Sequence, residues 1–131
     1  MKVTRGHEPG MPSDRRGPTF TGEVWADPVM AGGGAPTINT VFFPPGARTH
    51  WHSHEQGQLL FVTHGQGRVQ VRGGEGTVVG PGDVVWFPAG EVHWHGASPD
   101  SYLTHTAISL GETSWLDAVS DADYVAHEAG G

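Results

Sequence analysis

The stretch GARTHWHSHEQGQLLFVTHG, residues 46–65, contains the two patterns on which the interpretation of this sequence depends. Histidine stands at positions 50, 52 and 54, and alternate side chains of an extended chain project to the same side. An apolar run at residues 58–63 follows and is bounded by glycines, which is typical of a strand between turns. The stretch therefore predicts strands that carry imidazoles on one face.

Outside this stretch, short strand-like runs alternate with turns rich in glycine and proline. The runs cover residues 19–25, 37–43, 67–72, 76–79, 83–87, 92–95 and 102–110. The chain has 21 glycines and 10 prolines among 131 residues, too many helix breakers for a helical bundle. Residues 31–36 predict a flexible loop, and Ser120 with Asp123 predicts a short C-terminal helical turn. We predict an irregular arm at residues 1–18 and a single all-β domain, a sandwich or barrel, at residues 19–131.

Charge and cysteine content exclude several classes of function. With 7 basic and 14 acidic residues the formal charge is −7, so nucleic acid and anionic membranes are poor partners. The absence of cysteine excludes disulfides, thiolate metal sites and cysteine nucleophiles. No apolar run approaches the ~20 residues of a transmembrane helix, and no secretory signal is visible. We expect a cytoplasmic protein that acts on a small molecule.

The histidines favour a metal site. His93 and His95 repeat the spacing of His52 and His54, and two imidazoles on one face can bind one ion if a third ligand comes from another strand. Gln58 keeps the parity of His54 and offers a carbonyl oxygen. A nucleophilic serine triad is the weaker interpretation, because no serine stands in a G-x-S-x-G turn.

The same glycines, proline and histidines resemble the two cupin motifs. The first is Gly46-x5-His52-Ser53-His54-x3-Gln58-x6-Gly65, and the second is Gly82-x5-Pro88-Ala89-Gly90-x2-His93-x3-Ala97. The resemblance implies a cupin double-stranded β-helix, a jelly-roll barrel, with one divalent metal held by His52, His54, His93 and Gln58. Most metal cupins carry Glu at the position of Gln58 and Asn at that of Ala97. A neutral amide leaves the ion its full charge, which predicts a stronger Lewis acid.

Residues 45–49, 81–87 and 93–97 further resemble small bacterial manganese cupins with hydroxynitrile lyase activity, and the likeness covers about residues 20–124. It implies manganese as the metal, with iron, nickel, zinc, cobalt and copper as alternatives. It also implies that His95 and His105 line the cavity and move protons.

We therefore predict a lyase that cleaves or forms small cyanohydrins, with the metal as Lewis acid and His95 or His105 as general base. An iron-dependent dioxygenase and a non-catalytic domain that binds or senses a small ligand stay open. The expected substrate pocket consists of Val41, Phe43, His50, Leu60, Trp94, Leu103 and Ala107. Trp86 and Phe87 are assigned to the core. From the resemblance we also expect a homodimer in which residues 19–25 pack on the second subunit.

Overall fold

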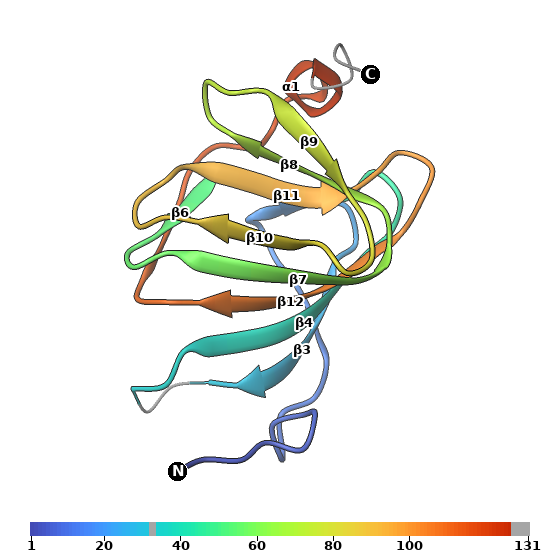
Figure 1. Ribbon diagram of the computed structural model, residues 1–131. Helices are drawn as coiled ribbons and strands as arrows, with labels where there is room; N and C mark the ends of the chain where they lie inside the picture. The colour runs from blue at the N-terminus through green and yellow to red at the C-terminus, as the bar shows by residue number, and fades with distance from the viewer. Residues whose placement is uncertain (32–33, 127–131) are drawn as a thin grey trace.

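Two antiparallel β-sheets form the protein in the computed structural model, which describes residues 1–31 and 34–126 (Figure 1). The six-stranded sheet has the order β1-β3-β4-β12-β7-β10, with bounds Asp14–Arg15, Trp25–Met30, Thr37–Phe43, Leu103–Ser109, Gln58–Gly65 and Val84–Phe87. The seven-stranded sheet has the order β13-β6-β11-β5-β2, with bounds Thr113–Trp115, His52–His54, His93–Ala97, Arg48–Thr49 and Phe20–Thr21. Strand β8 (Gly67–Val71) pairs with β11 and with β9 (Gly76–Val79). The predicted all-β, double-sheet architecture is confirmed.

Alternation along the strands places the core between the sheets. In β12, Leu103, His105 and Ala107 are buried, whereas Thr104 and Thr106 are partly exposed. The inward residues of β3, β4, β7 and β12 join one hydrophobic cluster with residues of the opposing sheet. Its members are Val24, Ala26, Val41, Phe43, Ala47, Leu60, Val62, Val69, Val79, Phe87, Ala97, Leu103 and Ala107.

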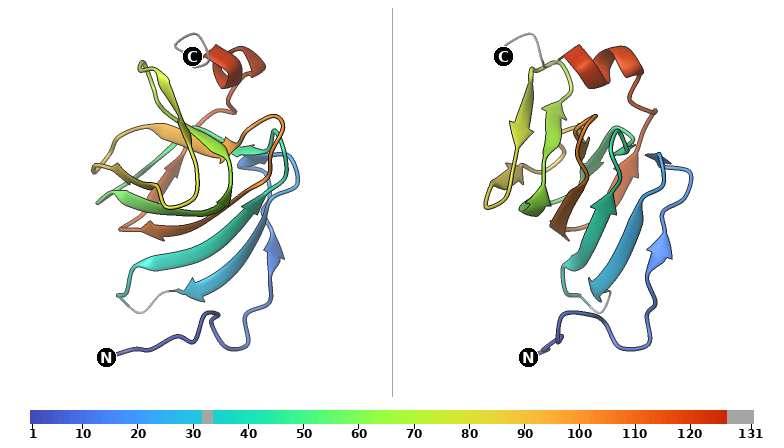
Figure 2. Two further views of the ribbon diagram at one scale, coloured as in Figure 1. Left: turned by 45° about the vertical axis from the view of Figure 1, so that its right-hand side comes forward. Right: turned by 90° about the vertical axis from the view of Figure 1, so that its right-hand side faces the viewer.

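A second, smaller cluster attaches the predicted C-terminal helix α1 (Asp121–Ala126). The Ser120 hydroxyl accepts a hydrogen bond from the Asp123 amide at 3.1 Å, which confirms the expected cap. The guanidinium of Arg48 lies 4.4 Å from the centroid of the Tyr124 ring, and the Tyr124 hydroxyl donates to the Ala97 carbonyl. The helix and the N-terminal arm lie at opposite ends of the molecule (Figure 2).

Three local expectations differ from the structure. The predicted strand 19–25 is divided into β2 and β3 because Gly22 has φ +89°, a value that side chains rarely permit, and contacts Ala47 closely. The arm includes the two-residue strand β1, which pairs with β3. Strand β13 was not expected. Residues 32–33 of the predicted loop lie outside the described part of the chain. Among the described residues, no helix has the length and apolar character needed to cross a membrane.

Candidate metal centre

Strands β6 and β11 bring the predicted metal ligands together. They pair antiparallel with His52 opposite His93, and these two imidazole centroids lie 4.4 Å apart. The His54 ring lies 5.0 Å from that of His52 and 5.8 Å from that of His93. The pairing of two H-x-H segments, some forty residues apart in sequence, thus clusters three imidazoles.

Oxygen atoms hold the Nδ1 atom of each imidazole. Nδ1 of His52 donates to the His50 carbonyl and Nδ1 of His93 to the Glu91 carbonyl, both at 2.9 Å. Nδ1 of His54 lies 3.1 Å from the Thr113 hydroxyl. A carbonyl can only accept, so the protons of His52 and His93 are on Nδ1 and their Nε2 atoms carry free lone pairs. This is the outer-shell arrangement that orients histidine ligands in metal sites.

The Gln58 side chain lies beside the three rings. Its Oε1 is 2.9 Å from Nε2 of His93, and its Nε2 donates to the Ser109 hydroxyl at 3.1 Å. With its proton on Nδ1, His93 has only a lone pair on Nε2, and this atom faces Gln58 Oε1, which is also an acceptor. A cation bound by both atoms would satisfy this arrangement. The same amide interacts with the rings of His52 and His54. The residues present therefore fit a divalent ion held by three imidazoles and one amide oxygen.

Burial keeps these imidazoles in the form that binds metals. It lowers the pKa of His52 and His54 from 6.5 to about 4 and that of His93 to about 2. All three are therefore neutral at pH 7, as metal ligation requires.

A second ligand set overlaps with the predicted one. Ligand atoms of His52, His93 and His95 all lie within 4.8 Å of one another, so His95 could take the place of His54. Among the described residues, neither Nε2 of His54 nor Nε2 of His95 has a hydrogen-bond partner, although both atoms are buried. The set of His52, His54, His93 and Gln58 stays a prediction.

His95 and His105 form a buried pair. Nε2 of His105 lies 2.9 Å from Nδ1 of His95. Burial lowers the pKa of His105 to about 4 and places that of His95 well below 6.5, so both rings are neutral at pH 7. His95 lines the cavity, but His105 does not. Phe43, whose ring lies 5.1 Å from that of His105, lines the cavity instead, so the expected place of His105 in the wall is corrected.

The cavity has a volume of about 350 Å³, the size of a site for a small molecule. Of the expected pocket residues, Val41, Phe43 and Ala107 line it, and His50, Leu60, Trp94 and Leu103 do not. Trp94 stands between two inward histidines and so projects to the opposite face, where it packs with Trp51 and Tyr124. Leu60 and Leu103 belong to the main core, and His50 lies between β5 and β6 with its amide bonded to the Thr19 carbonyl.

Sequence reasoning missed much of the cavity wall. The N-terminal segment contributes Arg16, Gly17, Thr19 and Phe20. The lining residues that the sequence analysis did not name also include Thr37, Asn39, Thr49, Ser109, Gly111, Thr113 and Trp115. Arg16 is the one cation among the described lining residues, which include no carboxylate. No local pattern marked the N-terminal segment, because its role depends on pairing between β2 and β5.

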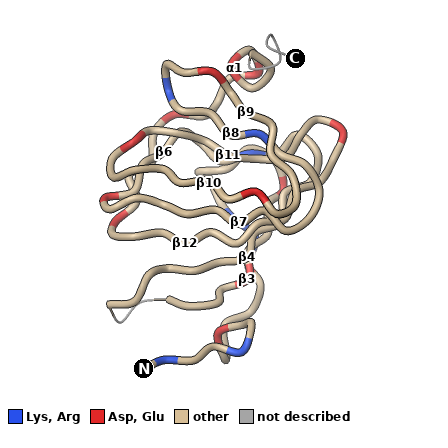
Figure 3. The backbone as a smooth tube through the Cα atoms, viewed as in Figure 1, with Lys and Arg blue, Asp and Glu red and all other residues tan. Residues whose placement is uncertain are grey.

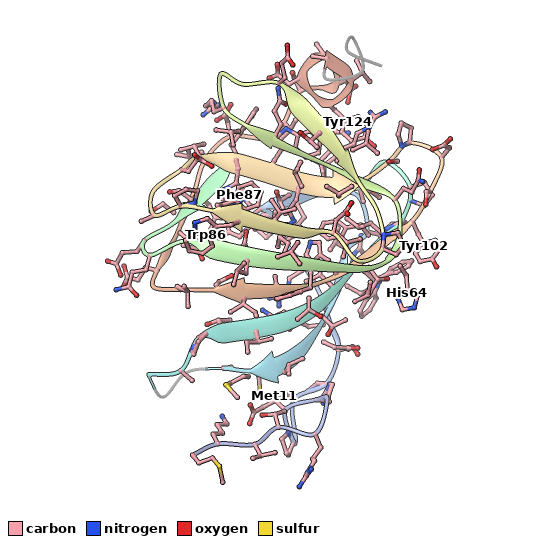
Figure 4. The ribbon with its side chains drawn as sticks, in the orientation of Figure 1. Met11, His64, Trp86, Phe87, Tyr102 and Tyr124 are labelled. Carbon is pink, nitrogen blue, oxygen red and sulfur yellow. The ribbon has the colours of Figure 1, made fainter. Side chains whose placement is uncertain are left out.

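Phe87 and Trp86 lie next to each other on β10 but in different environments (Figure 4). The Phe87 ring is buried and stacks on His93 with centroids 3.5 Å apart. Trp86 is 50% exposed, so its assignment to the core was wrong: it projects from the outer face of the sheet.

An antiparallel double-sheet barrel with a cluster of neutral imidazoles beside an internal cavity defines the class of small jelly-roll proteins suited to hold a metal ion. The family described as "Cupin domain" matches residues 39–108, and the chain belongs to this family.

Individual proteins are also similar to this chain. A protein of Granulicella tundricola named (R)-mandelonitrile lyase is 42% identical over 123 residues, which cover 88% of this chain and 94% of that protein. A cupin-like protein from Thermotoga maritima has a TM-score of 0.84 and 39% identity, covering 95% of this chain and all of that one. The polyketide cyclase RemF from Streptomyces resistomycificus has a TM-score of 0.72 at 19% identity, covering 97% and 94% of the two chains, and shares the fold.

Proposed function

We propose that this cupin is a metal-dependent lyase that cleaves and forms small cyanohydrins, with manganese as its metal. The observation that carries the proposal is the buried Nε2 of His95, which has no partner among the described residues and belongs to a ring that lines the cavity beside the other imidazoles. The name of the Granulicella protein supports the reaction class. The cytoplasmic location expected from the sequence belongs to the same proposal.

The metal would be held by His52, His54, His93 and Gln58. When bound, a divalent ion supplies Lewis-acid chemistry, which lowers the pKa of a hydroxyl that it contacts. Nδ1 of each imidazole is bonded to an oxygen atom, so the ligand rings are already oriented before an ion arrives.

His95 acts as the general base in this proposal. If its Nδ1–H donates to Nε2 of His105, its own Nε2 is an acceptor directed to the cavity. Nε2 takes the hydroxyl proton of the cyanohydrin, and the oxygen electrons form the carbonyl of an aldehyde. The bond between the carbinol and nitrile carbons breaks, and its electron pair leaves with cyanide. The proton on His95 then converts cyanide to hydrogen cyanide, which restores the neutral imidazole.

The remaining walls hold the organic group. Val41, Phe43 and Ala107 form an apolar side of the cavity, and the Phe43 ring contacts the His95 ring edge-on with centroids 5.9 Å apart. A small aromatic or aliphatic substituent fits this surface by burial of apolar area. His105 does not reach the cavity, so its role is to position His95.

The test is mandelonitrile cleavage, followed by the absorbance of benzaldehyde. We expect manganese-loaded protein to exceed the buffer rate and metal-stripped protein to lose that excess. His95→Gln should reduce cleavage at least tenfold, whereas His64→Gln, at an exposed histidine on β7, should not. Metal analysis of protein produced with and without added manganese checks the identity of the ion.

Each failure has a distinct meaning. Absence of cleavage by the fully loaded protein refutes the lyase. Oxygen consumption with iron in the site would then support the dioxygenase, and a tightly retained small ligand without turnover would support the binding domain. Equal cleavage with and without metal would refute the metal dependence alone.

A further inference from the structure

Arg16 gives the cavity a positive charge that no described lining residue balances. It is the one cation among these residues, which include no carboxylate. The histidines of the wall are neutral at pH 7, because burial lowers the pKa of His52, His54 and His95. A guanidinium, in contrast, stays charged in proteins. A cavity with this charge attracts anions.

The strands around the cavity add no charge of their own. Strands β2, β4, β6, β7, β11, β12 and β13, which supply most of the wall, contain no Lys, Arg, Asp or Glu. Figure 3 shows β4, β7 and β12 in tan, with coloured segments mainly in the turns and the terminal regions. Inside a protein, charges are screened less than they are in water. The charge of Arg16 therefore acts strongly on a ligand in the cavity.

A short strap, residues 14–21, carries Arg16 from one sheet to the other. Its strand β1 pairs with β3 of the six-stranded sheet, and its strand β2 pairs with β5 of the seven-stranded sheet. The Arg16 amide donates to the Val24 carbonyl, and the Thr19 carbonyl accepts from the His50 amide, both at 2.8 Å. The backbone of Arg16 is thus fixed before a ligand arrives, which is the preorganisation that electrostatic stabilisation requires.

The strap and the metal centre share one wall of the cavity. The Phe20 ring of the strap lies 5.5 Å from the Trp115 ring, which lies 4.6 Å from the ring of the predicted ligand His52. These three residues line the cavity together with Arg16 and His95. One small molecule in a cavity of about 350 Å³ can therefore contact both the metal centre and Arg16.

Most of the hydrogen-bonding capacity of Arg16 is unused. Its Nε lies 3.5 Å from Oδ1 of Asp14, whose side chain is 51% exposed, and an exposed ion pair of this kind contributes little. Among the described residues, neither Nη1 nor Nη2 of Arg16 has a hydrogen-bond partner. The Arg16 side chain is nevertheless only 30% exposed. An anionic ligand that accepts hydrogen bonds would satisfy these donors.

We propose that Arg16 forms the cyanide subsite of this cavity, where its Nη atoms donate to the nitrile nitrogen of a cyanohydrin. The role in the reaction rests on the proposed lyase, whereas the anion subsite rests on the cavity alone. When the bond between the carbinol and nitrile carbons breaks, its electron pair stays with the nitrile, which becomes cyanide. Arg16 stabilises this negative charge and keeps its own protons, and His95 supplies the proton that converts cyanide to hydrogen cyanide. Donors directed at a charge that develops in the transition state make a large contribution to catalysis.

The first experiment measures anion binding without the reaction. Thiocyanate is the probe, because it is a linear anion with a terminal nitrogen, and the metal-stripped full chain excludes its binding to the ion. An NMR titration follows the arginine Nε–H signals, and the signal that is missing from the Arg16→Gln spectrum identifies Arg16. We expect thiocyanate to shift this signal in a saturable way. Arg16→Gln, followed through the backbone amides of the cavity wall, should bind thiocyanate at least about tenfold more weakly.

Arg15→Gln is the matched control, because it removes the same charge one residue away. Arg15 is not a lining residue, and its side chain is 62% exposed near Glu23. This variant should change the thiocyanate affinity and the cleavage rate by less than about twofold. Arg16→Lys keeps the charge and should retain more thiocyanate affinity than Arg16→Gln. Circular dichroism identifies any variant that has lost its fold.

The second experiment measures mandelonitrile cleavage by the manganese-loaded protein. Arg16→Gln should lower kcat at least about tenfold and change KM by less than about threefold, because the charge that Arg16 stabilises develops only in the transition state. Cleavage by folded Arg16→Gln at the wild-type kcat would overturn the role in the reaction.

The two experiments separate this proposal from the lyase itself. Absence of thiocyanate binding, or equal binding by Arg16→Gln, would overturn the subsite even if the protein cleaves mandelonitrile. Equal weakening by Arg15→Gln would indicate a long-range charge effect and would overturn the direct contact. Thiocyanate binding at Arg16 in a protein that cleaves nothing when loaded would support the anion subsite and overturn its assignment to cyanide together with the lyase.

Discussion

Thr113→Val separates the two ligand sets that the structure allows. The Thr113 hydroxyl lies 3.1 Å from Nδ1 of His54 and is the hydrogen-bond partner that holds this ring. Valine keeps the shape of threonine and removes the hydroxyl. If His54 is a ligand, the substitution leaves its Nδ1 without that partner. Loss of one such hydrogen bond costs about 0.5–1.5 kcal/mol, and outer-shell changes in metal sites typically cost 10–100-fold in affinity.

We therefore expect Thr113→Val to bind manganese 10–100-fold more weakly than wild type, about 1.4–2.7 kcal/mol. The measurement is isothermal titration of the metal-stripped protein, with a competing chelator if binding is tight. Thr63→Val is the matched control, because the Thr63 hydroxyl bonds to the Thr104 carbonyl on an exposed strand position. It should leave the affinity within about twofold.

His105→Phe provides the opposite perturbation, since His105 contacts His95 and not His54. If the ligands are His52, His54, His93 and Gln58, this variant should keep most of its metal affinity. The reasoning is refuted if Thr113→Val binds as tightly as wild type while His105→Phe loses affinity. The ligand set would then be His52, His93 and His95, and His95 could not be the base.

Gln58→Glu should keep or strengthen metal binding but lower cyanohydrin cleavage at least tenfold, because a negative ligand reduces the charge that acts on the substrate hydroxyl. Titration calorimetry and the mandelonitrile assay check the two parts. The metal-free protein should lose stability in urea as the pH falls from 6.5 towards 4. Burial lowers the pKa of His52 and His54 to about 4, so between pH 6.5 and 4 the unfolded chain binds more protons than the folded chain. The free energy of unfolding should therefore fall by up to about 1.4 kcal/mol per pH unit for each histidine. Phe87→Ala should lower the free energy of unfolding by about 3–5 kcal/mol, because it leaves a cavity against His93.

Each of these predictions has a contradicting result. Faster cleavage by Gln58→Glu would oppose the Lewis-acid reaction and favour an oxygenase. Stability that is constant between pH 6.5 and 4 would mean that the buried histidines titrate as they do in the unfolded chain. Trp86→Ala is the comparison for Phe87→Ala, because Trp86 is exposed on the same strand. If both variants lose the same free energy of unfolding, the Phe87 ring does not contribute to the core as argued.

Local sequence patterns were sufficient for most of the longer strands and for the side of the chain on which the paired histidines project. Strands β4 and β9 begin and end at the predicted residues, because alternation and glycine turns act over a few positions. The H-x-H spacing placed His52 and His54 on one face for the same reason. Local pattern failed at β10, where the run VVWF is apolar on both faces and could not show that Trp86 faces outward.

The depth of each histidine and the wall of the cavity depended on the tertiary structure. Parity directs a side chain inward, but only the packing of Phe43 shows that His105 stands behind the cavity and His95 in its lining. The N-terminal segment that contains Arg16 lines the cavity, and its strand β2 pairs with β5, which is far away in sequence. Such pairings are set by the burial of whole sheet faces against each other, and a pattern read over a few residues contains no information about them.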